Sequence, residues 1–389
     1  MAEKSPKPIS EVKITEKASE LDGQIHADSR LVRIALDAMG GDNAPSAIVE
    51  GAIKAVEAMD DIEIILVGIN KVVEAELSGK LGSKHRIRIA HAEEVIGMDE
   101  SPSIAFRKKK KSSVHVGLRL VSNGTADAFV SAGNTGATMA TASVILRTLQ
   151  GIDRAAIAVV LPTQTGKTVL LDAGANVSCK AGQLYQFGMM GSMYAKHALE
   201  KEIPRVGLLS IGEEDNKGNI TTRKALEIFS KSQMNFIGNV EAKLLYKGIA
   251  DVVVCDGFTG NIALKISESV AEMIGAFLKV MFRKNIVTKF AYLLLKSSLR
   301  DFKKKVDHRE VGGAPLLGIN GAVFISHGSS DAKSIKSAIA AARKFVAENV
   351  NEHICKCIEK AVDLSNDEDE EDKQNGLWGQ FKKKIGFGT

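Results

Sequence analysis

The sequence predicts an α/β protein built on a mostly parallel β-sheet with helices on both faces. Apolar, β-rich runs as long as a strand alternate with helix-like stretches along most of the 389 residues. Several of these runs are apolar throughout, which is typical of strands that are covered on both sides. The 35 glycines far outnumber the 7 prolines, which indicates many tight strand-to-helix loops.

The first predicted unit illustrates the pattern that the rest of the chain repeats. Residues 33–38 form a strand, Gly40 and Gly41 end it, and Pro45 suits the first turn of a helix. Apolar positions 48, 52, 53 and 56 then fall on one helical face. Further strands are predicted at residues 61–68, 86–91, 126–131, 156–161, 168–171, 205–209, 235–237 and 251–255.

The segment TQTGKT, residues 163–168, superficially resembles a phosphate-binding P-loop. It lacks the first glycine of that motif, and a strand rather than a helix follows it. We therefore predict a hairpin turn between two antiparallel strands. The dinucleotide-binding pattern GxGxxG is also absent from the sequence.

The remaining segments are helical, loop-like or strongly charged. Residues 95–113 read as a loop that ends in a basic run, and 115–123 as a helix. In 267–305, apolar residues recur at helical spacing among basic ones, which predicts a helical hairpin. Three roles stay open for this hairpin: a subunit interface with a solvated basic face, a membrane-surface patch, or a docking site for an acidic carrier.

The domain organisation follows from these assignments. Residues 1–30 are predicted to be a disordered extension, and 31–362 to be the α/β domain, closing with loop and strand at 311–330 and a helix at 331–362. The tail, 363–389, has an acidic block followed by a basic, aromatic segment. That segment is expected either to be disordered or to touch a membrane surface.

Composition excludes several classes of protein. The net charge of +5 is diffuse, so we expect no nucleic-acid partner. The four cysteines have no metal-ligand spacing and indicate reduced, cytosolic thiols. No apolar stretch approaches the length of a membrane span or of a signal peptide.

Five predicted strands end in loops rich in Gly, Asn and Asp, which is where open α/β sheets place their ligands. Small residues let backbone N–H groups approach an anion, and a helix N-terminus favours negative charge. We therefore expect an anionic ligand, such as a phosphate. The five segments are IALDAMGGDNAP from Ile34, FVSAGNTGAT from Phe129, VLLDAGANVSCK from Val169, LLSIGEEDNKGN from Leu208 and VVVCDGFTGN from Val252.

Other reaction chemistries have little support. No Gly-x-Ser-x-Gly elbow is present, and the eight histidines are scattered without a His-Glu-x-x-His motif. The sequence therefore predicts no metal ion and no cofactor. The remaining inventory suits binding a phosphate, orienting an electrophile and stabilising an oxyanion.

Eight motifs between about residues 31 and 350 resemble those of the PlsX phosphate acyltransferases of bacterial phospholipid synthesis. They are DAMGGDNAP (37–45), SAGNTGA (131–137), LDAGANVSCK (171–180), PRVGLLSIGEEDNKGN (204–219), GNVEAKLL, DVVVCDGFTGN (251–261), GGAPLLGING (312–321) and HGSS (327–330). The chain departs from the usual pattern at Ser178, where Asp is common, and at Ala181-Gly182, where Pro-Glu is common.

The resemblance implies transfer of a fatty acyl group from acyl carrier protein to inorganic phosphate. The acyl phosphate product would then supply a membrane glycerol-3-phosphate acyltransferase. The resemblance also implies a homodimer, a cytoplasmic location with peripheral contact to the inner face of the membrane, and a three-layer α/β/α fold like those of phosphotransacetylases and isopropylmalate dehydrogenases.

On this resemblance, four residues are expected to be catalytic: Asn134, Asn176, Lys180 and His327. We expect Asn176 to orient the acyl carbonyl, Lys180 to neutralise phosphate, and His327 to act as acid or base or to be purely structural. Substrate contacts are expected from Asp37, Gly40, Gly41, Asp42, Asn43, Ser131, Gly133, Thr135, Gly136, Asp256, Thr259, Gly260, Asn261 and Lys265. Carrier-protein or membrane contacts are expected from Lys108, Lys109, Lys110, Lys111, Arg283, Lys284, Lys289 and Lys296.

Two other functions compete with this interpretation. One is a phosphotransacetylase that uses a small acyl-CoA. The other is a non-catalytic scaffold that gathers lipid enzymes at the membrane, although retention of every loop argues against it.

Overall fold

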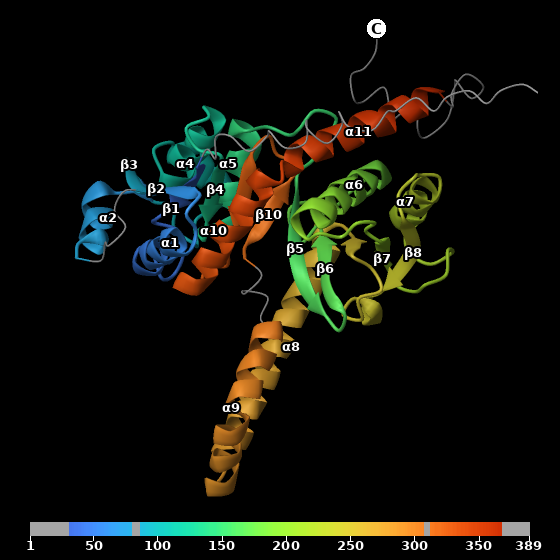
Figure 1. Cartoon of the computed structure of the whole chain (residues 1–389). Helices are drawn as coiled ribbons and strands as arrows, with labels where there is room; N and C mark the ends of the chain where they lie inside the picture. Colours follow the sequence, from blue (N-terminus) through green and yellow to red (C-terminus); the bar gives the residue numbers. More distant parts are fainter. Residues whose placement is uncertain (1–30, 80–85, 307–311, 368–389) are drawn as a thin grey trace, which may run out of the picture. The chain divides into compact units, whose positions relative to one another are not determined.

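The structure, a computed structural model, describes residues 31–79, 86–306 and 312–367 (Figure 1). From Val32 onward these residues belong to one compact unit. They form an 11-stranded sheet with the order β3-β2-β1-β4-β11-β10-β5-β6-β9-β7-β8. The strands are β1 (Val32–Asp37), β2 (Ile62–Gly68), β3 (Ile87–His91), β4 (Ala128–Ser131), β5 (Ala156–Thr163), β6 (Gly166–Leu171), β7 (Val206–Ser210), β8 (Phe236–Glu241), β9 (Val252–Val254), β10 (Ala314–Leu317) and β11 (Ala322–Ile325).

The sheet consists of two parallel halves that run in opposite directions. In the first half, β3, β2, β1, β4 and β11 are all parallel neighbours. In the second half, β6, β9, β7 and β8 are parallel. β10 and β5 join the halves through antiparallel pairs, with β10 beside β11 and β5 beside β6. The loops that follow the strands of the two halves therefore leave the sheet in opposite directions.

Helices cover both faces of the sheet, which gives the three-layer α/β/α arrangement. One core cluster packs α1, α2, α6, α7, α10 and α11 on one face, and two others pack α3, α4, α5 and the beginning of α8 on the opposite face. The bounds are α1 (Ser46–Ala58), α2 (Asn70–Leu77), α3 (Pro102–Lys108), α4 (Ser113–Ser122), α5 (Thr135–Ile145), α6 (Ala181–Ala198), α7 (Ile220–Ser230), α8 (Gly257–Arg283), α9 (Ile286–Val306), α10 (Ala332–Ala347) and α11 (Val350–Asp367).

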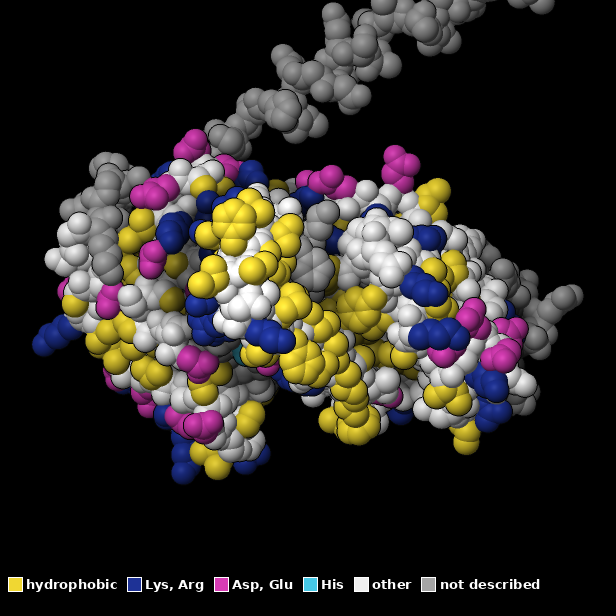
Figure 2. All heavy atoms as spheres, turned by 90° about the horizontal axis from the view of Figure 1, so that it is seen from below, with side chains coloured by type: hydrophobic (Ala, Val, Ile, Leu, Met, Phe, Trp, Pro, Cys, Tyr) yellow, Lys and Arg dark blue, Asp and Glu magenta, His cyan; other side chains and the backbone are white. Residues whose placement is uncertain are grey.

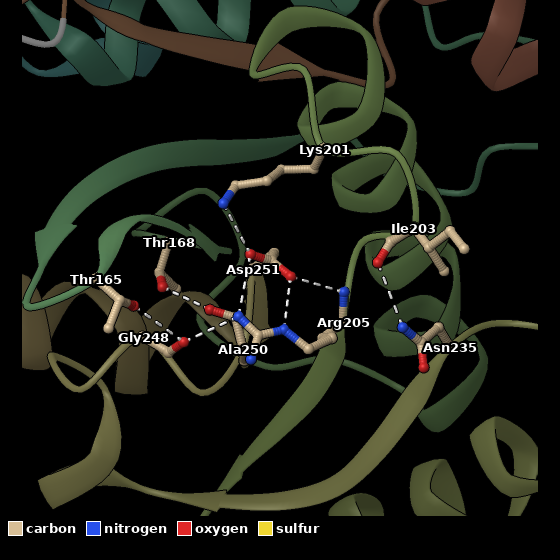
Figure 3. Close-up of polar contacts among 9 residues, drawn as sticks. All are labelled: Thr165, Thr168, Lys201, Ile203, Arg205, Asn235, Gly248, Ala250 and Asp251. Atoms are coloured by element: carbon tan, nitrogen blue, oxygen red, sulfur yellow. Dashed lines mark hydrogen bonds and ion pairs between the residues drawn. The ribbon is translucent and has the colours of Figure 1, made fainter.

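An Arg–Asp pair ties neighbouring parallel strands together in each half. Just before β9, the Asp251 carboxylate accepts hydrogen bonds from the backbone N–H of Arg205 (3.0 Å) and from its guanidinium Nε (2.9 Å), and Lys201 approaches the same carboxylate at 3.2 Å (Figure 3). Before β4, Asp127 accepts from the N–H and the guanidinium of Arg33 at 2.8–3.0 Å. The same device therefore fixes the start of one strand pair in each half.

Helices α8 and α9 form a hairpin that extends beyond the sheet (Figure 1). Large apolar side chains on it are exposed, among them Phe277 at 66%, Val280 at 70% and Ile286 at 83%. Figure 2, which looks at this side of the molecule, shows apolar side chains gathered over the hairpin. The hairpin therefore presents an unusually apolar surface.

The structure confirms most predicted elements and corrects three. The antiparallel β5–β6 hairpin occupies the TQTGKT segment as predicted. The predicted loop at 95–113 instead contains α3. The helix predicted at 331–362 is two helices, broken where Asn349 has φ of 47°, and the second runs to Asp367, past the predicted start of the tail. Residues 1–30 and the basic, aromatic end of the tail lie outside the described residues.

Candidate active site

A buried carboxylate supports the loops after β1 and β4 through hydrogen bonds. Asp37 is 1% exposed, and burial raises its pKa, although hydrogen bonds from neighbours oppose that change. It accepts a hydrogen bond of 2.7 Å from the Ser131 hydroxyl, which itself accepts from the N–H of Gly133 at 3.0 Å. Both side chains support the loop surface without reaching solvent, so the substrate contacts predicted for them stay a prediction.

Glycine allows these loops to touch backbone to backbone. A Cβ on Gly40 would lie 2.8 Å from Gly133 Cα and 2.4 Å from Asp37 Oδ2, so no larger residue fits there. Gly41 has φ of 105°, a conformation that favours glycine. These contacts explain the glycine-rich sequence of both loops.

The loop after β11 joins the same group. The N–H of Asp42 donates to the carbonyl of Gly328 at 2.8 Å, and the Asn43 amide donates to the carbonyls of Ser329 and Ser330. Loops from three adjacent strands, β1, β4 and β11, thus form one continuous surface.

Asn134 is fully engaged in holding this surface. Its side-chain oxygen caps α5 by accepting from the N–H of Ala137 at 2.9 Å, and its amide donates to the carbonyls of Met98 and Glu100, both at 2.9 Å. It is 8% exposed. The geometry favours a positioning role, and the catalytic role expected for Asn134 stays a prediction.

His327 is exposed and has a defined orientation. Its Nδ1 accepts from the N–H of Ser329 at 3.2 Å and lies 2.8 Å from the Ser329 hydroxyl. In the neutral imidazole, the proton therefore resides on Nε2, which has no partner among the described residues and can donate to a ligand.

A second buried carboxylate, Asp172, organises the loop after β6. It is 0% exposed, and burial raises its pKa. It accepts from the N–H groups of Ile157 (3.0 Å) and Ala175 (2.9 Å) and from both the N–H (2.7 Å) and the amide (2.9 Å) of Asn176. The Asn176 amide also donates to the Ala155 carbonyl at 2.7 Å. Asn176 is thus held within the loop and is 7% exposed.

The loop after β9 packs tightly against the loop of Asp172. The N–H of Gly257 donates to the Asn176 carbonyl at 2.8 Å, and a Cβ on Gly260 would lie 1.9 Å from the Asp172 carbonyl oxygen. Asp256 caps α8 by accepting from the N–H of Thr259 at 2.7 Å. The loops after β6 and β9 therefore form a second group in the other half of the sheet.

A cleft of about 310 Å³ separates the two groups of loops. Its polar lining includes Thr135 and His327 from the first group and Asn261 and Lys265 from the second, and Lys265 pairs with Glu268 at 2.8 Å. Its apolar lining includes Ile157, Val159, Leu264, Ala314 and Ile325. The cleft therefore offers polar groups beside a wall suited to an aliphatic chain.

The predicted site residues divide between this cleft and its supports. Of the four predicted catalytic residues, only His327 lines the cleft. Lys180 is exposed at the start of α6 and is not among the residues that line the cleft. The fourth predicted loop, after β7, is also absent from the cleft lining and is tied to β8 by a hydrogen bond from Asn239 to the Glu214 carbonyl.

Sequence reasoning missed Asp172 and the β5 wall of the cleft. A signal for Asp172 exists, because Leu171-Asp172-Ala173 repeats the Leu36-Asp37-Ala38 that ends the first strand. The β5 wall carries no such signal, since its residues look like those of any buried strand.

The basic residues that are predicted to make contacts differ in whether they form ion pairs among the described residues. Lys109 pairs with Glu100 and donates to the Val95 carbonyl at 2.7 Å, while Lys111 pairs with Glu93 at 2.8 Å. Lys108 and Lys110 are exposed, and no ion pair engages them among the described residues. On the hairpin, the basic residues predicted to make contacts are also exposed: Arg283, Lys284, Lys289 and Lys296.

A family model described as a fatty acid synthesis protein matches residues 32–353. A phosphate acyltransferase from Trichlorobacter lovleyi is 50% identical over 323 residues, which cover 83% of this chain and 93% of that protein. One from Halothermothrix orenii is 49% identical over 321 residues, covering 82% and 96%. The chain belongs to the phosphate acyltransferase family.

This membership makes the chain an acyltransferase and places it in fatty acid and lipid synthesis. Solved structures show the fold. A phosphotransacetylase from Streptococcus pyogenes aligns with a TM-score of 0.57 at 20% identity, covering 82% of this chain and 94% of that one. Another from Staphylococcus aureus aligns with a TM-score of 0.52 at 17% identity, covering 81% and 94%. Among the described residues, no helix is long and apolar enough to cross a membrane.

Proposed function

We propose that this phosphate acyltransferase moves a fatty acyl group from acyl carrier protein to inorganic phosphate, and that its acyl phosphate product feeds phospholipid synthesis through a membrane glycerol-3-phosphate acyltransferase. The observation that carries the proposal is the cleft, in which polar residues of two opposing loop groups adjoin an apolar wall. Such a lining can bind both an anion and an aliphatic acyl chain, with the acyl carbonyl next to the anion.

The reaction needs no protein nucleophile. A phosphate oxygen attacks the thioester carbonyl carbon, the C–O bond forms, and the C–S bond breaks as the thiolate leaves and takes up a proton. A thiol with a pKa of about 8.5 is a good leaving group. Inorganic phosphate is largely ionised near neutrality, by comparison with phosphoryl monoesters whose second pKa is about 6.

The described groups supply positioning and charge stabilisation. Thr135 begins α5, and the helix N-terminus favours an anion. The Nε2–H of His327 and the amide of Asn261 are donors for the phosphate or for the carbonyl oxygen as it gains charge. Lys180, which is exposed at the start of α6, retains its proposed role in neutralising phosphate.

Acyl carrier protein is the proposed donor because basic residues stand beside the first loop group. The exposed Lys108 and Lys110 lie at the end of α3, which packs on α5 through the close contact of Pro102 with Gly136. Acyl carrier proteins are acidic, so charge attraction would guide the donor to this end of the cleft.

A homodimer is proposed from the apolar seam on α8. Its exposed apolar residues recur with alternating spacings of four and three: Ile266, Val270, Met273, Phe277 and Val280. This spacing is typical of a helix that packs against other helices in a coiled-coil arrangement. A second copy of the hairpin would cover the seam. Phe277→Glu with Val280→Glu should then yield monomers in analytical ultracentrifugation, and a retained dimer would reject the seam.

Peripheral membrane contact is proposed at the turn of the hairpin. There, the exposed Ile286 and Val287 stand among the basic residues Arg283, Lys284 and Lys289. Apolar and basic groups together suit an anionic lipid surface. Flotation with anionic vesicles, comparing the native protein with Arg283→Glu and Lys284→Glu, tests it, and equal flotation would reject the contact.

Release of free thiol in the presence of phosphate tests the reaction. Palmitoyl–acyl carrier protein should release thiol only when phosphate is added, and acyl phosphate should accumulate. Acetyl-CoA should be the poorer donor. A preference for acetyl-CoA would establish the competing phosphotransacetylase activity, and the absence of thiol release with either donor would favour a non-catalytic scaffold.

A further inference from the structure

The cleft lies where the sheet splits. β5 and β10 are paired only through Ala156 with Leu317 and Ile157 with Leu316. β5 continues to Thr163 and stays paired with β6 along this whole length. No described strand pairs with residues 158–163 on the side that faces β10. One edge of β5 therefore becomes free inside the sheet.

The hydrogen bonds of Ile157 show which peptide groups lie on that free edge. Its N–H donates to Asp172 Oδ1 at 3.0 Å, and its carbonyl accepts from the N–H of Ala173 at 3.0 Å, so both groups face β6. Peptide groups alternate sides along a strand. Those of Ala158 and Val160 therefore face the other way. Ala158 is fully buried, whereas Val160 lines the cleft.

Pro162 independently marks the same edge. It lies inside β5, opposite Lys167 of β6, and two residues after Val160. A proline has no N–H and is tolerated in a strand only where that group would be unpaired. Because Pro162 shares the orientation of Val160, its position agrees with an edge that no neighbouring strand covers.

This free edge runs beside the reactive groups of the cleft. Val159 and Val160 line the same cleft as His327 and Asn261. A strand edge recognises an extended ligand that carries amide N–H and C=O groups. The thioester donor of the proposed reaction has such a part, since pantetheine places two amides next to its thiol.

We propose that the cleft-facing edge of β5, at Val160, binds the amide-bearing pantetheine arm of the acyl donor. The arm lies along β5 as an added strand would, and its amides pair with the N–H and C=O of Val160. This places the thioester beside His327 and Asn261 and leaves the apolar wall to the acyl chain. The proposal rests on the proposed function, and it names the part of the donor that the strand recognises.

A series of thioesters that share one acyl group tests this recognition. The carriers are pantetheine with two amides, N-acetylcysteamine with one and mercaptoethanol with none. In the native protein, KM should rise about 2- to 10-fold for each amide lost, the range expected for one net hydrogen bond. Val160→Pro removes one cleft-facing N–H and spares the β6 ladder. It should raise KM for the pantetheine thioester and leave KM for the mercaptoethanol thioester unchanged.

Val160→Ala is the matched control, because it keeps the N–H and removes the side-chain methyl groups. It should preserve the discrimination between the thioesters. Equal KM values across the series in the native protein, or unchanged discrimination in Val160→Pro, would overturn the proposal. If Val160→Pro does not fold, hydrogen exchange in the native protein decides. The pantetheine thioester, but not the mercaptoethanol thioester, should slow exchange at residues 158–163, and equal exchange would overturn the proposal.

The two natural sources of the arm are separated by comparing acyl carrier protein with acyl-CoA. Both carry pantetheine, so Val160→Pro should raise KM for both by the same factor. An effect on neither would count against the β5 site. Failure of the proposed function looks different, because the native protein would then release no thiol with any donor when phosphate is added.

Discussion

The Ser131 hydroxyl donates a 2.7 Å hydrogen bond to the Asp37 carboxylate, and neither side chain reaches solvent. Asp172 repeats this arrangement in the other half of the sheet, where backbone N–H groups of its own loop surround the carboxylate. Both aspartates follow a leucine at the end of a strand. The two loop groups that face each other across the cleft are thus each built around a buried carboxylate.

Removing the Ser131 hydroxyl should destabilise the first loop group. Ser131→Ala leaves the buried Asp37 carboxylate and the N–H of Gly133 without this partner, at a cost of about 1–3 kcal/mol for an unsatisfied buried group. Urea unfolding at pH 7 measures the loss. Ser329→Ala, which removes an exposed hydroxyl, is the control and should have a smaller effect. Equal stability of Ser131→Ala and the native protein would contradict the supporting role.

Gly260 should tolerate no side chain. A Cβ there would lie 1.9 Å from the Asp172 carbonyl oxygen, so Gly260→Ala must push the loops after β6 and β9 apart. We expect a loss of stability of more than about 1 kcal/mol, by analogy with overpacking in a core, together with a raised KM for phosphate.

Gly275→Ala is the matched control on the same helix. A Cβ at Gly275 has no heavy atom within 4 Å, and alanine in an exposed helix is favoured by about 0.5–1 kcal/mol over glycine. Urea unfolding and phosphate-dependent thiol release compare the two variants. Similar behaviour of both would refute the close approach of the loops.

The sequence predicts strands and loops well because their signals are local. Apolar β-rich runs and the Gly-Asn-Asp loops that follow them depend on residues close in the chain. The order of strands depends on pairs such as Ala156 with Leu317, which no local pattern reveals. The reversal of direction between the halves, and with it the cleft, could therefore not be predicted from periodicity.

Site residues were harder to predict for a related reason. The asparagines of the Gly-rich loops look alike in sequence. The amide of Asn134, however, donates hydrogen bonds to backbone carbonyls, whereas Asn261 lines the cleft. The difference depends on the segment containing Met98 and Glu100, about 35 residues earlier in the chain. Hydrogen-bond partners at such separation leave no mark at the asparagine itself.

Asp251 should make the fold sensitive to acid. Burial alone would raise its pKa, but hydrogen bonds from Arg205 and Lys201 outweigh it, so the pKa is lowered (Figure 3). A carboxyl whose pKa is lowered in the folded protein stabilises the fold at pH values above its unfolded pKa of about 3.9. This contribution is lost as the pH falls through the folded pKa.

Asp251→Asn should therefore lower the free energy of unfolding at neutral pH. On acidification, the free energy of unfolding should fall less in this variant than in the native protein. The free energy of unfolding at pH 7 and pH 3.5 measures both effects. Asp60→Asn is the control, because its side chain is fully exposed beside Arg86. An unchanged difference between the two pH values in Asp251→Asn would exclude this carboxylate as a source of acid sensitivity.

The stacked imidazoles of His197 and His353 should make the contact between α6 and α11 weaken below neutral pH. Their ring centroids are 3.6 Å apart with an angle of 7° between the planes. Burial, followed by the charges of His353 and Lys196, lowers the pKa of His197. A histidine whose pKa is lowered in the folded protein stabilises the fold at pH values above its unfolded pKa of about 6.5, and this contribution is lost as the pH falls.

His197→Phe keeps an aromatic ring in the stack and removes the titrating group. The free energy of unfolding should therefore fall less between pH 7.5 and pH 5.5 in His197→Phe than in the native protein. The residual dependence should include His115, whose pKa burial also lowers. Identical slopes for the native and variant proteins would show that His197 does not govern the acid response of the α6–α11 contact.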